Sequence, residues 1–223
     1  MKNRGIAFDL EGTIINLEQL HFNAFVSAME EYGFVTTFET IITHIPLAIG
    51  GGDAVIAEGL RSLYSRDISI DEILLKKRQY YESDLENTLI VPREGFIDFL
   101  LSVQKQRIKT AIGSLTPRAS GEYLLERAGL GKYFPPDTRV FLEDVANKKP
   151  APDVYQRTAD LMGISASEQI VFEDSVPGVM AASAAGCKVI AMPIFASATN
   201  LAKLSQAGAS KIYLNWREVN LKE

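Results

Sequence analysis

Short apolar runs alternate with helical patterns along most of the chain. Apolar runs of strand length lie at residues 5–9, 108–113, 139–141, 169–172, 188–191 and 211–214. Apolar residues recur at helical spacing at residues 94–106, 120–128, 153–162 and 179–185. Strands that alternate with helices form parallel sheets with helices packed on both faces. The pattern therefore predicts an α/β fold with a doubly wound parallel sheet.

Residues 16–91 interrupt this alternation, because they show no convincing strand pattern. Helical spacing predicts helices over residues 17–32, 37–43 and 53–64, and a fourth helix that begins after Ser69. Glu72 follows Ser69 by three residues, which is the pattern of a capping box at a helix start. We therefore expect a core domain of residues 1–15 and 92–223, and an all-helical domain of residues 16–91.

The composition is that of a folded globular protein, with 47% hydrophobic and 23% charged residues in a chain of 223 residues. The net charge of −5 gives no reason to expect a nucleic acid or an anionic membrane as a partner. Cys187 is the single cysteine, which excludes a disulfide within the chain and favours a reducing compartment. The first apolar run stops at Asp9, too early for a signal peptide. We expect a cytoplasmic protein that is a monomer or a small homo-oligomer.

Two carboxylates follow the first strand at once. Asp9 and Glu11 are spaced i, i+2, so they share a face if the strand geometry persists. Gly12 and Thr13 come next, and a glycine lets the backbone turn and present N–H groups to an anion. Paired carboxylates suit a hard cation and the loop suits a phosphate. The alternative is a strand that simply ends in polar turn residues.

Polar residues also follow later strands. Ser114 ends the second strand, Lys149 lies in a loop before a helix, and Glu173 with Asp174 ends the strand over 169–172. Open parallel sheets bind ligands beyond the carboxyl ends of their strands. Each residue alone has an ordinary explanation, such as a helix cap or a solvated loop. Their combined order is the informative observation.

That order resembles the motifs of the haloacid dehalogenase (HAD) superfamily. The motifs are Asp-x-Glu-Gly-Thr at residues 9–13, a strand ending in Ser114, Lys-Pro-x-Pro-Asp at 149–153, and Glu-Asp-Ser-x-x-Gly at 173–178. The details are most similar to the β-phosphoglucomutase-like branch of sugar-phosphate phosphatases and mutases. The resemblance implies a Rossmann-like core, with a helical cap inserted where residues 16–91 stand.

The resemblance also implies a chemistry, phosphate release through an aspartyl-phosphate with Mg²⁺ as the cofactor. It assigns catalysis to Asp9, Glu11, Ser114 and Lys149. It assigns substrate and phosphate binding to Gly12, Thr13, Leu115, Thr116 and His21. It assigns the metal to Asp9, Glu11, Glu173 and Asp174, with Glu11 binding through its backbone carbonyl. Asp9 matches the nucleophile and Glu11 the general acid and base.

Glu11 departs from the family pattern, which usually has aspartate at this position. The extra methylene adds about 1.5 Å of reach, while the reference pKa of glutamate is only about 0.4 above that of aspartate. Acid–base capacity therefore survives, and geometry becomes the open question. The enolase-phosphatase branch also has Asp-x-Glu-Gly-Thr, whereas dehalogenase members lack an acidic residue there. The sequence therefore favours phosphatase chemistry over dehalogenation.

The sequence lacks basic residues that a mutase would need to bind a second phosphate. No Lys or Arg occurs between Asp9 and Leu60, and Pro117 stands where a mutase-like lysine would follow Ser114. A second phosphate therefore has few partners, with Arg61 and Arg118 as candidates. We expect a phosphatase that acts on a singly phosphorylated small metabolite, such as a sugar or polyol phosphate. Two alternatives stay open: a β-phosphoglucomutase-type mutase, and a non-catalytic binding protein.

The run Gly50–Gly52 has two interpretations. It lets a cap loop approach a substrate closely, or it only joins two helices. Trp216, near the C-terminus, has no sequence partner that suggests a role.

Overall fold

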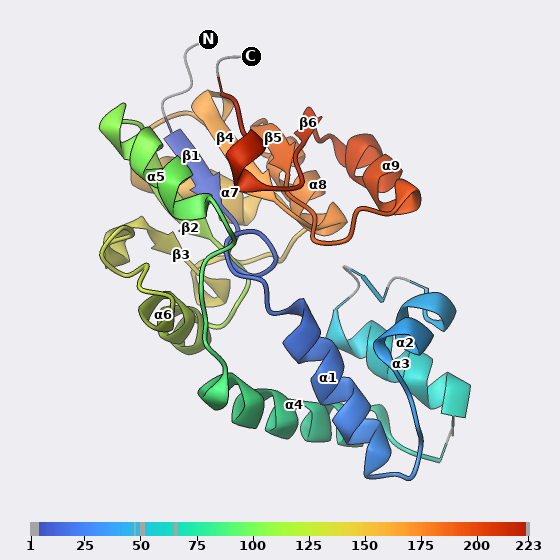
Figure 1. Ribbon diagram of the computed structural model, residues 1–223. Coiled ribbons are helices and arrows are strands. Elements are labelled where there is room, and N and C mark those ends of the chain that lie inside the picture. Colours follow the sequence, from blue (N-terminus) through green and yellow to red (C-terminus); the bar gives the residue numbers. More distant parts are fainter. Residues whose placement is uncertain (1–4, 47, 50–51, 65–66, 222–223) are drawn as a thin grey trace. The chain divides into compact units, whose positions relative to one another are not determined.

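A computed structural model describes residues 5–46, 48–49, 52–64 and 67–221 (Figure 1). The chain divides into two compact units, which we name the α/β unit (Met1–Asn16 with Ile90–Glu223) and the helical unit (Leu17–Leu89). The two interpretations of Gly50–Gly52 depend on Gly50 and Gly51, which lie outside the described residues.

The α/β unit contains a six-stranded parallel sheet in the order β3-β2-β1-β4-β5-β6. Its strands are β1 (Gly5–Phe8), β2 (Lys109–Gly113), β3 (Arg139–Val140), β4 (Gln169–Glu173), β5 (Lys188–Ala191) and β6 (Lys211–Ile212). Phe8 pairs in register with Ile112 on β2 and with Phe172 on β4. Residues that follow these three central strands therefore emerge at the same edge of the sheet.

Helices cover both faces of this sheet (Figure 1). They are α5 (Phe96–Lys105), α6 (Arg118–Arg127), α7 (Asp153–Met162), α8 (Val176–Ala184) and α9 (Ala198–Ala207). Small and β-branched strand residues such as Ala7 and Val171 pack with α7 and α8 on one face. Phe8 and Phe172, which alternate with them, contact Phe99 of α5 on the other face. The predicted doubly wound α/β fold is confirmed.

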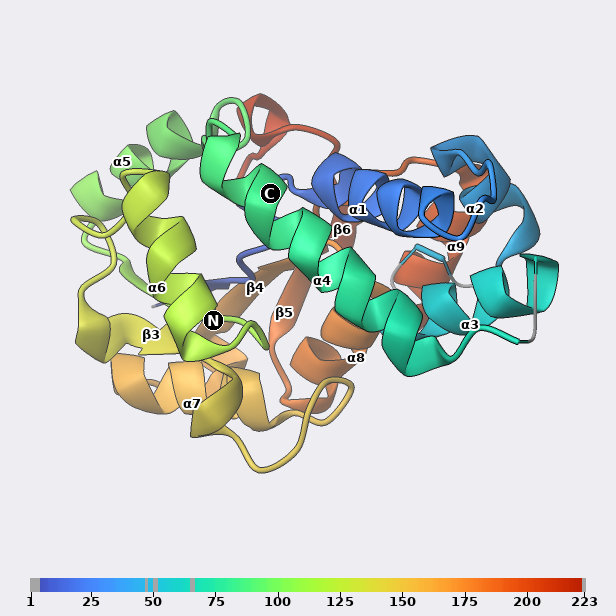
Figure 2. The same ribbon diagram turned by 90° about the horizontal axis from the view of Figure 1, so that it is seen from below.

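The helical unit consists of α1 (Glu18–Glu30), α2 (Phe38–His44), α3 (Asp53–Tyr64) and α4 (Ile70–Asn87). Helix α1 packs against α4, which also contacts α3 (Figure 2). The predicted capping box is present: the Ser69 hydroxyl accepts from the Glu72 amide at 3.0 Å. The Glu72 carboxylate accepts from the Ser69 amide at 3.1 Å. Helix α4 therefore begins where the capping-box pattern of Ser69 and Glu72 predicts.

The structure differs from the sequence pattern at two helices. Helix α9 was not among the predicted elements, although Ser197 caps its start and Gly208 its end. Helix α8 begins at Val176 rather than Val179, because the Ser175 hydroxyl accepts from the Gly178 amide at 3.2 Å. Within the described residues, no helix combines the length and apolar character needed to cross a membrane.

Candidate active site

The first loop carries Asp9 at the carboxyl end of β1. The Asp9 amide donates to the Phe172 carbonyl at 3.0 Å, so the strand pairing continues through this residue. Gly12 then turns the chain with a φ of +86°. A Cβ on Gly12 would lie 2.2 Å from Asp174 Oδ2, so a side chain has no room there. Glycine is required at this position by both its backbone angle and the approach of Asp174.

Lys149 joins two buried carboxylates. Its ammonium donates to Asp9 Oδ1 at 2.6 Å and to Glu173 Oε1 at 2.6 Å. It also donates to the Gly113 carbonyl at the end of β2, at 3.3 Å. The Lys149 side chain is 8% exposed, that of Asp9 9% and that of Glu173 0%. Pairing offsets part of the cost of burying these charges.

Glu173 has hydrogen bonds on both carboxylate oxygens. Besides Lys149, Oε1 accepts from the Tyr155 hydroxyl at 2.8 Å. Oε2 accepts from the Asp174 amide at 2.9 Å, and from the Ser175 amide and hydroxyl, each at 3.0 Å. A Cβ on Gly178 would lie 1.7 Å from Glu173 Oε1, so the helix start leaves room for this carboxylate. Glu173 is thereby fixed to hold Lys149.

The carboxylates of this cluster differ in pKa. Burial raises the pKa of Asp9 to about 7, against the opposing effect of Lys149. Burial also acts on Glu173, but Lys149 and several hydrogen bonds bring its pKa below the usual value. Burial would lower the pKa of Lys149, yet Asp9 and Glu173 raise it above the ordinary value. Of these two carboxylates, Asp9 therefore carries the less stabilised negative charge.

Three carboxylates form a group suited to a metal ion. One oxygen from each of Asp9, Glu173 and Asp174 lies within 4.8 Å of the others. The Thr13 hydroxyl donates to Asp174 Oδ1 at 3.1 Å and so orients this carboxylate. Hard divalent cations such as Mg²⁺ take oxygen ligands of this type. The donor set therefore fits the predicted cofactor.

A hydroxyl chain links β2 to Glu11. The Thr116 hydroxyl donates to Glu11 Oε1 at 2.5 Å and lies 2.9 Å from the Ser114 hydroxyl. A hydroxyl has one proton, so the Ser114 hydroxyl must donate to Thr116 in this contact. Ser114 in turn accepts from the Thr116 amide at 3.2 Å. Thr116, which the sequence predicts to bind phosphate, thus orients Glu11. Leu115, also predicted to bind phosphate, is half-buried and lies between Ser114 and Thr116 in the chain.

His21 belongs to the helical unit, where it contacts a buried lysine. The Lys77 ammonium lies 2.7 Å from His21 Nδ1 and donates to Asp53 Oδ2 at 2.6 Å. Lys77 is 3% exposed, and its ammonium lies 4.8 Å from the centroid of the Tyr81 ring. The sequence pattern did not predict this cluster of His21, Asp53, Lys77 and Tyr81. The one sign of it in the sequence was a lysine on the apolar stripe of α4.

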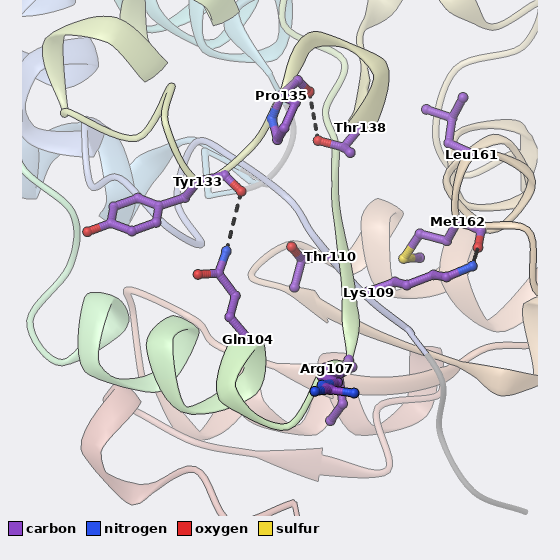
Figure 3. A pocket seen from close by; sticks show the side chains of 10 residues that line it. Gln104, Arg107, Lys109, Thr110, Tyr133, Pro135, Thr138, Leu161 and Met162 are labelled. Carbon is purple, nitrogen blue, oxygen red and sulfur yellow. Dashed lines mark hydrogen bonds between the residues drawn. The ribbon is translucent and has the colours of Figure 1, made fainter.

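A separate pocket of about 370 Å³ lies at the amino end of β2 (Figure 3). Its lining includes Gln104, Arg107, Lys109, Tyr133 and Met162. Three of its polar side chains donate to carbonyls of the pocket wall, as Figure 3 shows. Gln104 donates to the Tyr133 carbonyl at 3.5 Å, Lys109 to the Met162 carbonyl at 2.5 Å and Thr138 to the Pro135 carbonyl at 2.7 Å. None of the predicted site residues lines this pocket.

The fold and the site together define an α/β enzyme with a carboxylate-rich centre at the carboxyl ends of its strands. Residues 6–192 match the family of haloacid dehalogenase-like hydrolases, and the chain belongs to this family.

Similar proteins include two phosphatases. The phosphorylated carbohydrates phosphatase of Thermotoga maritima is 29% identical over 185 residues, covering 83% of this chain and 82% of that protein. The fructose-1-phosphate phosphatase YqaB of Escherichia coli K12 is 30% identical over 187 residues, covering 83% of this chain and 94% of that protein. The structure of CbbY from Rhodobacter sphaeroides in complex with phosphate has a TM-score of 0.73 at 25% identity, covering 96% of this chain and 95% of that chain.

These findings confirm the predicted superfamily and the prediction of a hydrolase. The names of the two relatives agree with the predicted phosphoric monoester hydrolase.

Proposed function

We propose that the protein is a Mg²⁺-dependent phosphatase that hydrolyses the phosphate monoester of a small sugar or polyol through an aspartyl-phosphate on Asp9. The observation that carries this proposal is the buried Asp9 carboxylate with the Lys149 ammonium at 2.6 Å. Asp9 lies beside Asp174 at the carboxyl ends of the central strands. A nucleophilic carboxylate needs such nearby positive charge, because it must approach a phosphate dianion.

The reaction then has two steps. Asp9 attacks the phosphorus, the bond to the substrate oxygen breaks, and Glu11 gives a proton to the departing alcohol. A water molecule next attacks the phosphorus of the aspartyl-phosphate while Glu11 takes a proton from it. The Asp9 carboxylate and inorganic phosphate are released, so the enzyme returns to its starting state. The hydrogen bond from Thr116 to Glu11 supports this role, because it holds the longer side chain in one orientation.

Other residues bind the transferring group. Lys149 would donate to phosphoryl oxygens, and Ser114 would do so by turning its hydroxyl proton from Thr116 to the phosphate. The turn at Gly12 and Thr13 would bring backbone amides to the same group. The metal would be held by Asp9, Asp174 and the Glu11 carbonyl, with Glu173 beside it. When bound, Mg²⁺ supplies charge neutralisation for the attacking carboxylate and the phosphate oxygens. We assign Glu173 mainly to holding Lys149, because both of its oxygens already accept hydrogen bonds.

The substrate proposal rests on charge and on the relatives. No Lys or Arg occurs between Asp9 and Leu60, which disfavours a second phosphate on the substrate. The two similar phosphatases are named for phosphorylated carbohydrates and for fructose 1-phosphate. We further propose that residues 16–91 act as a cap that selects the substrate, with His21 as a candidate contact.

Phosphate release from p-nitrophenyl phosphate and from fructose 1-phosphate, with Mg²⁺ and with EDTA, tests the proposal. We expect metal-dependent release, and a loss of at least about 10³-fold in kcat for Asp9→Asn, because the nucleophile is removed. Asp160→Asn, on α7 and exposed, is the matched control and should leave kcat unchanged. Conversion of β-glucose 1-phosphate to glucose 6-phosphate faster than phosphate release would indicate the mutase instead. Absence of metal-dependent release would indicate the binding protein.

A further inference from the structure

Arg93 is a half-buried arginine whose guanidinium contacts main-chain carbonyls of three segments. Nη1 donates to the carbonyls of Gly12 at 2.7 Å, Thr13 at 3.3 Å and Met192 at 2.5 Å. Nη2 donates to the carbonyls of Pro193 at 3.4 Å and Leu214 at 3.2 Å. One side chain therefore joins the first loop, the chain after β5 and the C-terminal segment.

The same loop is held from a second side by Trp216, the first residue of the short helix η4 (Trp216–Glu218). The indole Nε1 donates to the Thr13 carbonyl at 3.3 Å, the oxygen that Arg93 also contacts. The Trp216 ring packs on Phe172 and Phe96, with centroid distances of 4.9 and 5.0 Å. Trp216 is thus anchored in the core and presents its N–H to the loop.

These contacts fix the orientation of two peptide groups. A trans peptide places its C=O and N–H on opposite sides, so holding a carbonyl also aims the next amide. The Thr13 carbonyl is directed to Arg93 and Trp216, and the following Ile14 amide donates to the Leu10 carbonyl at 3.0 Å, which closes the turn. Thr13, held on its carbonyl, donates its hydroxyl to Asp174 Oδ1.

We propose that Arg93 and Trp216 are positioning residues for the reaction, which hold the first loop so that Thr13 keeps Asp174 beside Asp9. The role rests on the proposed function, and neither residue touches the reacting atoms. Trp216 lies beyond residue 192, where the family match ends. Arginine is needed because its planar fork reaches several carbonyls at once, whereas a lysine ammonium cannot span them.

The experiment compares Arg93→Lys and Trp216→Phe with Arg139→Lys as the matched control. Arg139 is likewise an arginine that donates to carbonyls, those of Phe134 and Gly131, but it holds the connection between α6 and β3 and also pairs with Glu122 of α6. The measurements are kcat and KM with p-nitrophenyl phosphate, Mg²⁺ affinity by calorimetry, and amide exchange of the peptide spanning residues 9–16.

For Arg93→Lys we expect kcat to fall about ten-fold or more with KM changed less than about three-fold, because misplacement affects the transition state. Mg²⁺ affinity should fall, and exchange in residues 9–16 should rise about ten-fold or more. Trp216→Phe keeps the ring packing and loses one hydrogen bond, so its effects should be smaller and in the same direction. Arg139→Lys should lower stability while kcat stays within about two-fold of the wild type.

The proposal is wrong if Arg93→Lys leaves both exchange in residues 9–16 and kcat within about two-fold of the wild type. It is equally wrong if Arg139→Lys lowers kcat and speeds exchange in residues 9–16 as much as Arg93→Lys does. Should the wild-type protein release no phosphate, the proposed function fails on its own. Exchange in residues 9–16 and Mg²⁺ affinity then still decide whether Arg93 and Trp216 hold the loop.

Discussion

At the scale of single residues, Glu173 is the group on which the geometry of the candidate site depends. It is fully buried, and its two oxygens accept from Lys149, Tyr155, Asp174 and Ser175. Lys149 in turn reaches Asp9, so the position of the ammonium follows from that of Glu173. Small changes around Glu173 should therefore affect catalysis through Lys149 rather than directly.

Gly178→Ala tests this dependence. The new Cβ would lie 1.7 Å from Glu173 Oε1, so the carboxylate has to move. Overpacking of this kind costs about 1–3 kcal/mol of unfolding free energy, and we expect kcat to fall about ten-fold or more as Lys149 is displaced. Gly131→Ala is the control, because its Cβ would meet its nearest neighbour at an ordinary 3.4 Å. Equal activity of the two variants would contradict the assigned role of Glu173.

Cys187 gives a prediction about pH. Burial raises the pKa of its thiol from 9.0 to about 11, although a hydrogen bond from Gln169 acts in the other direction. Below pH 9 the thiol is neutral in both states, so it contributes its full stability there. Between pH 9 and about 11 the unfolded chain loses the proton while the native thiol keeps it, so the free energy of unfolding falls.

Urea unfolding of the wild type and of Cys187→Ala at pH 8 and pH 10 measures this effect. The wild type should lose more stability between the two pH values than the variant, which lacks the titrating group. An equal loss in both proteins would show that the thiol does not titrate as its burial requires.

At the scale of elements, most helices and strands follow from the period of apolar residues and from caps. Helix α9 does not, because Leu204 is its one buried residue and no apolar stripe marks it. The predicted start of α8 was late because its first turn carries a serine cap and Pro177 rather than an apolar pattern. The capping box of α4 shows that a polar signal suffices where it is present.

Ser69→Ala measures that capping signal directly. The variant loses the hydroxyl that accepts from the Glu72 amide, and we expect the first turn of α4 to lose about 1 kcal/mol of stability. Amide exchange in a peptide spanning residues 70–76 reports on this turn. Ser83→Ala, at an exposed position within the same helix, should change exchange there by much less. Similar exchange in both variants would contradict the importance of the cap.

At the scale of the whole molecule, topology explains why the candidate site could be predicted, whereas the residues that hold its first loop, Arg93 and Trp216, could not. Parallel strands place Asp9, Ser114 and Glu173 at one edge of the sheet, so their order in the sequence was enough to group them. Arg93 and Trp216 bind backbone carbonyls, which every residue has, so no residue type marks their partners in the sequence. Lys77 could not be paired for a different reason: its partner Asp53 is a charged side chain, but their ion pair depends on how the helices pack.

The central claim is that Asp9 carries the phosphoryl group between two steps. Glu11→Gln separates these steps, because p-nitrophenolate departs without a proton while the second step needs a base. With p-nitrophenyl phosphate we expect one rapid equivalent of p-nitrophenol per site, followed by slow turnover. Mass spectrometry of the quenched variant should find one phosphoryl group on the peptide that contains Asp9. Continued turnover with no phosphorylated peptide, or with the group on another residue, would contradict the account.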